Sequence, residues 1–70
     1  MSVTGEYRVS GMHCQHCVSS VTEEVSAISG VTDVTVDLDS GRLIVTSNTV
    51  IPFESIEAAV DEAGYAVAAA

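Results

Sequence analysis

The sequence contains no lysine, and its only cations besides histidine are Arg8 and Arg42. Ten Asp and Glu residues outnumber them and give a formal net charge of −8 at pH 7. Proteins that bind nucleic acid or an anionic membrane surface need clustered Lys and Arg side chains. The charge therefore excludes nucleic acid as a partner and indicates, if anything, a partner with a basic surface.

Long apolar runs are also absent. None approaches the roughly 18 residues that a membrane-spanning helix needs. The first residues, MSVTGE, lack the basic and apolar segments of a secretory signal. We therefore expect a cytoplasmic protein without direct membrane insertion. The 70 residues, with Met1 at one end and alanines at the other, indicate a free-standing single domain spanning residues 1–70.

Tryptophan is missing too, and small Val and Ala residues supply most of the apolar content, which predicts a thin core. Apolar residues recur every three or four positions in two segments and alternate in four others. We predict strands at 6–10, 34–38, 42–47 and 65–67, and helices from about 18 to Gly30 and from Pro52 to Gly64. The order βαββαβ predicts a ferredoxin-like α+β sandwich, with a four-stranded antiparallel sheet covered on one face by two helices.

Cysteine and histidine occur only in one short stretch, GMHCQHC, residues 11–17. A pair of cysteines three residues apart in a reducing compartment indicates metal binding or redox activity, because structural disulfides are rare there. Cys14 and Cys17 come at the start of the predicted first helix, where unpaired backbone N–H groups and the positive end of the helix dipole favour thiolates. Acidic, accessible thiols suit a metal carrier and also a thiol–disulfide oxidoreductase.

The number of ligands distinguishes among the metals. A structural zinc site takes four ligands, and the four candidates His13, Cys14, His16 and Cys17 are too close in sequence to form a tetrahedron. Two thiolates alone suit a soft ion such as Cu(I). Low coordination also leaves space for an incoming thiolate, so the ion can be handed over by ligand exchange.

GMHCQHC resembles the GMxCxxC motif of the heavy-metal-associated domain, a family of small copper chaperones and N-terminal domains of copper-transporting P-type ATPases. The stretch AVDEAGY, residues 59–65, is similar to the end of the family's second helix. The resemblance covers nearly the whole chain. It implies a non-enzymatic copper chaperone that binds Cu(I) through Cys14 and Cys17 and passes it to the metal-binding domain of such an ATPase. A copper-bridged homodimer stays open as a second assembly.

The resemblance also assigns roles to neighbouring residues. Met12 becomes a core residue under the loop rather than a ligand, and Gly11 permits the turn from strand to loop. Tyr65 would lie near the sulfurs, where it shields them or presents its hydroxyl. The alternative for Tyr65 is a plain core aromatic.

The histidines depart from the family pattern. In the zinc-exporting branch the position of His13 often carries Asp, so its replacement by an imidazole favours Cu(I) over Zn(II). Our hypothesis is an auxiliary role for His13 or His16: a third ligand, a hydrogen-bond partner that tunes the thiolate pKa, or a contact between two chaperones sharing copper. The alternative for each is an exposed imidazole that does not touch the metal.

Three other interpretations remain at this point. The CQHC pair superficially resembles the CxHC of oxidising thioredoxin-like enzymes, in which a histidine stabilises the thiolate. The only proline, Pro52, instead falls at a predicted helix start. A second interpretation keeps the fold and changes the cargo to Zn(II), Cd(II) or Hg(II). A third takes the sequence as an N-terminal domain of an ATPase.

Overall fold

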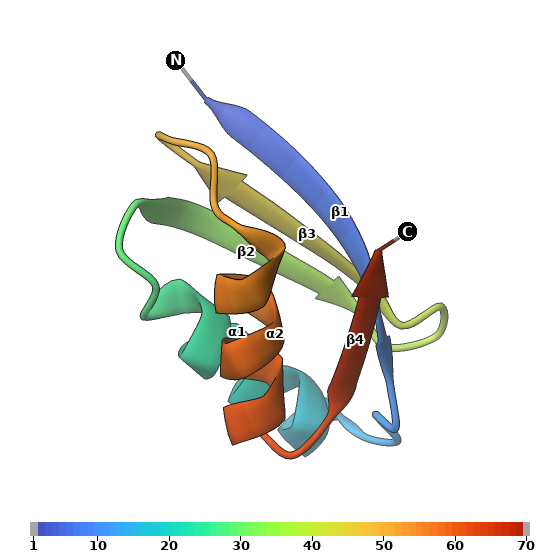
Figure 1. Cartoon of the computed structure of the whole chain (residues 1–70). Coiled ribbons are helices and arrows are strands. Elements are labelled where there is room, and N and C mark those ends of the chain that lie inside the picture. The colour runs from blue at the N-terminus through green and yellow to red at the C-terminus, as the bar shows by residue number, and fades with distance from the viewer. Residues whose placement is uncertain (1, 70) are drawn as a thin grey trace.

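The computed structural model describes residues 2–69 and has two helices and four strands (Figure 1). The elements follow the order β1 (Val3–Ser10), α1 (Gln15–Ser26), β2 (Val31–Asp37), β3 (Arg42–Ser47), α2 (Phe53–Glu62) and β4 (Ala66–Ala69). The strands form one antiparallel sheet in the spatial order β2-β3-β1-β4. The prediction of a ferredoxin-like α+β fold is therefore confirmed.

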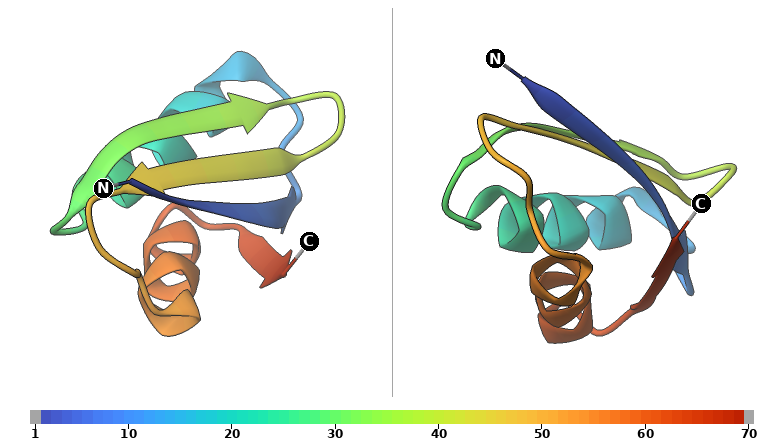
Figure 2. Two further views of the ribbon diagram at one scale, coloured as in Figure 1. Left: turned by 90° about the horizontal axis from the view of Figure 1, so that it is seen from above. Right: turned by 45° about the horizontal axis from the view of Figure 1, so that its top comes forward.

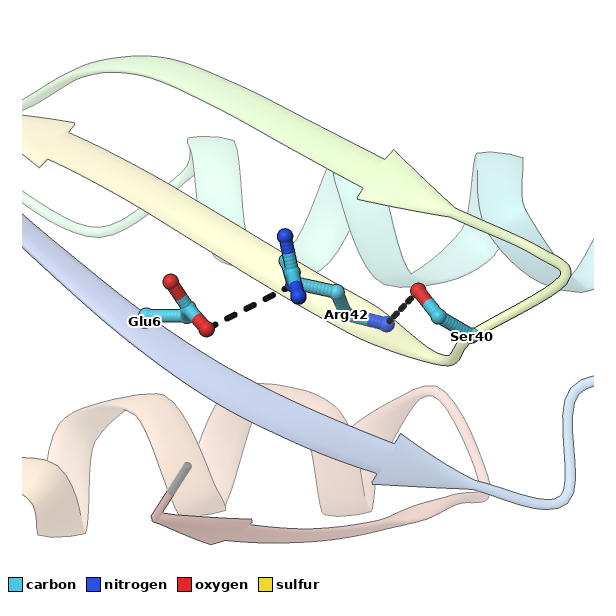
Figure 3. A network of polar contacts seen from close by, with 3 residues as sticks. All are labelled: Glu6, Ser40 and Arg42. Carbon is cyan, nitrogen blue, oxygen red and sulfur yellow. Dashed lines mark hydrogen bonds and ion pairs between the residues drawn. The ribbon is translucent and has the colours of Figure 1, made fainter.

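Both helices pack against the same face of the sheet (Figure 2). Figure 3 shows polar side chains on the opposite face, with the helices behind the sheet. There Glu6 on β1 and Arg42 on β3 form an ion pair with 3.4 Å between Oε2 and Nε. The backbone N–H of Arg42 also donates to the Oγ of Ser40 at 3.3 Å. Side chains alternate between the two faces of a strand, so those on this exposed face do not contribute to the core.

The core lies between the sheet and the helices and is made of aliphatic side chains. Five of them are fully buried: Leu43 from β3, Val21 and Val25 from α1, and Ile56 and Val60 from α2. Their four-residue spacing on each helix is part of the pattern that the sequence shows. Each fully buried side chain of this kind stabilises the fold by about 1.5–3 kcal/mol.

The boundaries of strands β1 and β2 differ from the predicted ones by several residues. β1 begins at Val3 rather than at residue 6, because residues 3–5 continue the ladder with β3 as far as Val3↔Ser47. β2 covers 31–37 instead of 34–38, and Leu38 lies in the turn since pairing with β3 ends at Asp37↔Arg42. Long-range pairing, which a local alternation pattern does not contain, sets these limits.

The boundaries near the thiol pair differ as well. α1 begins at Gln15 and ends at Ser26, several residues before Gly30, whose positive φ of 95° serves the turn into β2 instead. β4 covers 66–69 rather than 65–67. Tyr65 therefore precedes the strand, and its N–H donates to the carbonyl of Val60 at 3.1 Å as α2 ends. The connections β1–α1 and α2–β4 lie at the same end of the molecule (Figure 1).

Candidate metal centre

The loop that leads to the thiol pair starts at Gly11, directly after β1. Its φ of +93° lies in the left-handed region, which glycine adopts without the strain of a Cβ atom. A Cβ at this position would also lie 3.4 Å from the Cδ1 atom of Tyr65. Glycine thus turns the chain, and the Tyr65 ring lies beside the loop.

Cys14 is the N-cap of α1, and Cys17 lies in the first turn. The Cys14 backbone is extended, with φ −154° and ψ 170°, and its carbonyl accepts hydrogen bonds from the N–H groups of Cys17 at 3.0 Å and Val18 at 3.3 Å. This turn brings both thiols to one side, with 3.5 Å between their Sγ atoms. Since a disulfide bond measures about 2.05 Å, both cysteines are free thiols.

The separation of the sulfurs determines how the pair can hold an ion. With a metal–sulfur bond of about 2.3 Å, the length found in zinc thiolates, two sulfurs 3.5 Å apart subtend an angle of about 100° at the ion. A linear ion between them would require about 4.6 Å with bonds of that length. In this conformation the pair would hold an ion from one side and leave the other side open. Cys14 is exposed, and Cys17 is half-buried.

The electrostatics of the site favour the thiolate at Cys17. A backbone hydrogen bond from His13 lowers the pKa of Cys17 to about 7, with the Tyr65 hydroxyl and the Cys14 thiol acting in the same direction. The first turn of α1 contains no acidic residue, so no carboxylate there offsets the positive end of the helix dipole near the sulfurs. The same hydrogen bond to Cys17 raises the pKa of Tyr65, because it stabilises the phenol over the phenolate.

The histidine side chains do not join this arrangement. His13 and His16 are both exposed, and residues 2–69 contain no group of three or more Cys, His, Asp or Glu side chains placed to share an ion. The contribution of His13 comes from its backbone, which agrees with the expected effect of unpaired N–H groups at the helix start. The start of a helix directly after it, where N–H groups lack partners, was the signal available. Met12 is half-buried and packs against the core.

Comparison with known proteins bears on the family directly. The model of the heavy-metal-associated domain matches residues 6–66, which is most of the chain and includes the whole of the thiol loop. The chain belongs to the heavy-metal-associated domain family. The resemblance stated from the GMHCQHC motif is thereby confirmed.

Relatives of this heavy-metal-associated domain include whole chaperones and a part of an ATPase. It is 37% identical to the copper chaperone CopZ of Bacillus subtilis over 87% of this chain and 90% of that protein. It is equally identical to copper-transporting ATPase 1 of Rhizobium meliloti, over 89% of this chain but 8% of the ATPase. A solved structure of a CopZ metallochaperone matches with a TM-score of 0.87 and 30% identity, over 94% of this chain and all of that one.

These comparisons decide between a non-enzymatic metal carrier and a thiol–disulfide oxidoreductase. The relatives that the domain matches along most of their length include copper chaperones, which are non-enzymatic metal carriers. The prediction that the chain is not an enzyme is confirmed, and the oxidoreductase interpretation is set aside. Within residues 2–69, neither helix has the length and apolar character to cross a membrane.

Proposed function

We propose that this heavy-metal-associated domain is a cytoplasmic copper chaperone that carries Cu(I) between Cys14 and Cys17. The observation that supports the proposal most is the geometry of the two free thiols, which lie 3.5 Å apart at the start of α1. The lowered pKa of Cys17, about 7, keeps a large share of this thiol ionised at neutral pH, and a thiolate is the form that binds metal. The copper chaperones among its relatives support the choice of copper.

Transfer is the second part of the proposal. The open side of the thiol pair gives an incoming thiolate access to the ion, so the ion moves through a three-coordinate state in which one sulfur at a time is replaced. The acceptor we propose is the metal-binding domain of a copper-transporting P-type ATPase, whose family contains a segment similar to this chain. A copper-bridged homodimer uses the same chemistry, with the thiols of a second copy as the incoming ligands.

The cargo test is an anaerobic titration of the apo-protein with Cu(I) against a chromogenic chelator, repeated with Zn(II). We expect one Cu(I) per chain and loss of binding in the variant Cys14→Ser/Cys17→Ser. The variant Ser19→Ala/Ser26→Ala, altered at two exposed positions of α1, is the matched control and keeps full binding. Tight Zn(II) binding with weak Cu(I) binding would overturn the choice of metal.

Zinc is the second candidate because an angle of about 100° at the ion also suits a tetrahedral site. Zn(II) in a closed site takes four protein ligands, however, and residues 2–69 bring only the two thiols together. The hypothesis that His13 or His16 completes the site is therefore tested by the same titration. Retention of Cu(I) affinity in His13→Ala/His16→Ala would leave the two thiols as the whole ligand set of the monomer.

A further inference from the structure

We propose that α2 and the outer edge of β4 form a docking groove for an extended, lysine- or arginine-bearing segment of a partner protein, which pairs with β4 as an additional strand. The groove has a volume of about 340 Å³. It is lined by Glu54, Glu57, Ala58 and Asp61 from α2, by Tyr65 before β4, and by Ala66 and Val67 of β4. The proposal goes beyond the proposed copper chaperone function and does not depend on bound metal.

The backbone of β4 is the first observation. β4 is the last strand of the sheet order, and no strand among residues 2–69 pairs with its outer side (Figure 2). The N–H of Val9 donates to the Gly41 carbonyl, at the β3 side of β1. Since the direction alternates along a strand, Ala66 and Ala68 face their β1 partners, and Val67 directs its N–H and C=O outward. These outward groups are the template that strand addition uses.

The two edges of the sheet are built differently. The opposite edge, β2, has a bulge between Val31 and Asp33 and carries two exposed carboxylates, Asp33 and Asp37. Bulges, charged side chains and short edge strands are among the devices by which proteins prevent strands from adding to an edge. β4, Ala66–Ala69, has neither a bulge nor a charged residue. β4 is protected only by its length of four residues, so of the two edges it is the one with no bulge or charge against a further strand.

The negative charge of the groove favours a positively charged occupant. Glu54, Glu57 and Asp61 follow one another at helical spacing on one face of α2, and all three are exposed. The groove is lined by no Lys, Arg or His, and the ion pair found within residues 2–69 joins Glu6 to Arg42 on the far face of the sheet. In an added strand every second side chain points toward α2, so Lys or Arg at alternate positions would meet these carboxylates.

A second copy of this chain is a poorer occupant. Pairing of β4 with β4 of another copy would bring two acidic α2 faces toward each other in a protein of net charge −8. Like charges across an interface oppose association. At its far end the groove reaches Tyr65, whose hydroxyl acts on Cys17, so a segment bound there would end beside the thiol pair.

The test uses the metal-free protein and two synthetic peptides that alternate lysine and valine. One peptide is unmodified, and the other carries N-methyl groups on alternate backbone amides, which keeps the charge but removes strand pairing. We expect amide NMR shifts at Val67, Ala69 and the exposed face of α2 with the first peptide, slowed hydrogen exchange at Val67, and at least tenfold weaker binding of the methylated peptide.

A pair of triple variants tests the charge of the groove. We expect Glu54→Gln/Glu57→Gln/Asp61→Asn to weaken binding at least tenfold. The control Glu23→Gln/Glu24→Gln/Asp33→Asn removes as many charges elsewhere and should weaken binding far less. The proposal would be overturned if the unmodified peptide failed to bind or if both peptides bound equally. Equal effects of both variants, or NMR shifts confined to another surface, would also overturn it. Concentration-dependent dimers protected at Val67 would assign the edge to a second copy instead. Cu(I) binding is measured separately, so neither result decides the other.

Discussion

Tyr65, just before β4, acts on Cys17 in the first turn of α1, where its hydroxyl favours the ionised thiol. The contact lowers the pKa of Cys17 and raises that of Tyr65, because it favours the thiolate and the protonated phenol together. It joins the two connections at one end of the fold (Figure 1). The chemistry of the thiol pair therefore depends on a residue distant in the sequence.

Removal of this hydroxyl is expected to weaken the acidity of the thiol. In Tyr65→Phe the pKa of Cys17 should rise above its value of about 7. The rate of alkylation by iodoacetamide, followed against pH in the apo-protein, measures it. Tyr7→Phe is the matched control, since Tyr7 packs against Phe53 with 6.0 Å between ring centroids. An unchanged alkylation profile in Tyr65→Phe would show that the hydrogen bond has no influence.

The backbone of His13, rather than its imidazole, is the largest cause of the lowered Cys17 pKa. We therefore expect His13→Ala to keep the alkylation profile of Cys17, because the variant keeps the N–H group. His13→Ala/His16→Ala should also keep its Cu(I) affinity within tenfold, which corresponds to about 1.4 kcal/mol. A larger loss of affinity, or a shifted pH dependence, would assign an imidazole to the metal or to its immediate surroundings.

The stability of the reduced apo-protein should depend on the ionisation of Cys17. Its pKa is about 7 in the folded chain and about 8.5 for an ordinary cysteine, so folding favours the thiolate. The resulting stabilisation is fully present above pH of about 8.5 and is lost as the pH falls through about 7. Urea unfolding of the native protein and of Cys17→Ser across this range measures it. The difference in unfolding free energy between the two proteins should increase with pH; a constant difference would contradict the prediction.

The core should respond strongly to the loss of volume in α2. Ile56 is fully buried, and Ile56→Ala is expected to lower the unfolding free energy by about 2–5 kcal/mol because it leaves a cavity between helix and sheet. Val50→Ala is the control, since Val50 is 74% exposed and its truncation should change stability by less than about 0.5 kcal/mol. Equal effects of Ile56→Ala and Val50→Ala in urea unfolding would mean that the packing of Ile56 from α2 does not stabilise the core.

Several features of this protein follow from the sequence alone. Local periodicity was enough to predict the fold, because Val18, Val21 and Val25 form a helical face and Leu43 and Val45 alternate along a strand. The motif GMHCQHC was enough to indicate the family, because its residues are adjacent in the chain. The placement of the cysteines at a helix start, which favours thiolates, also needed only local information.

The tertiary structure decided what depends on contacts between distant segments. The limits of β1 and β2 follow from pairing with β3. The family resemblance implied that Tyr65 lies near the sulfurs, and the fold decided between this position and a plain core aromatic. The exposure of both histidines and the acidic groove along β4 likewise appear only when the chain is folded. Periodicity reports which face of an element is buried, and it contains no information on which elements meet.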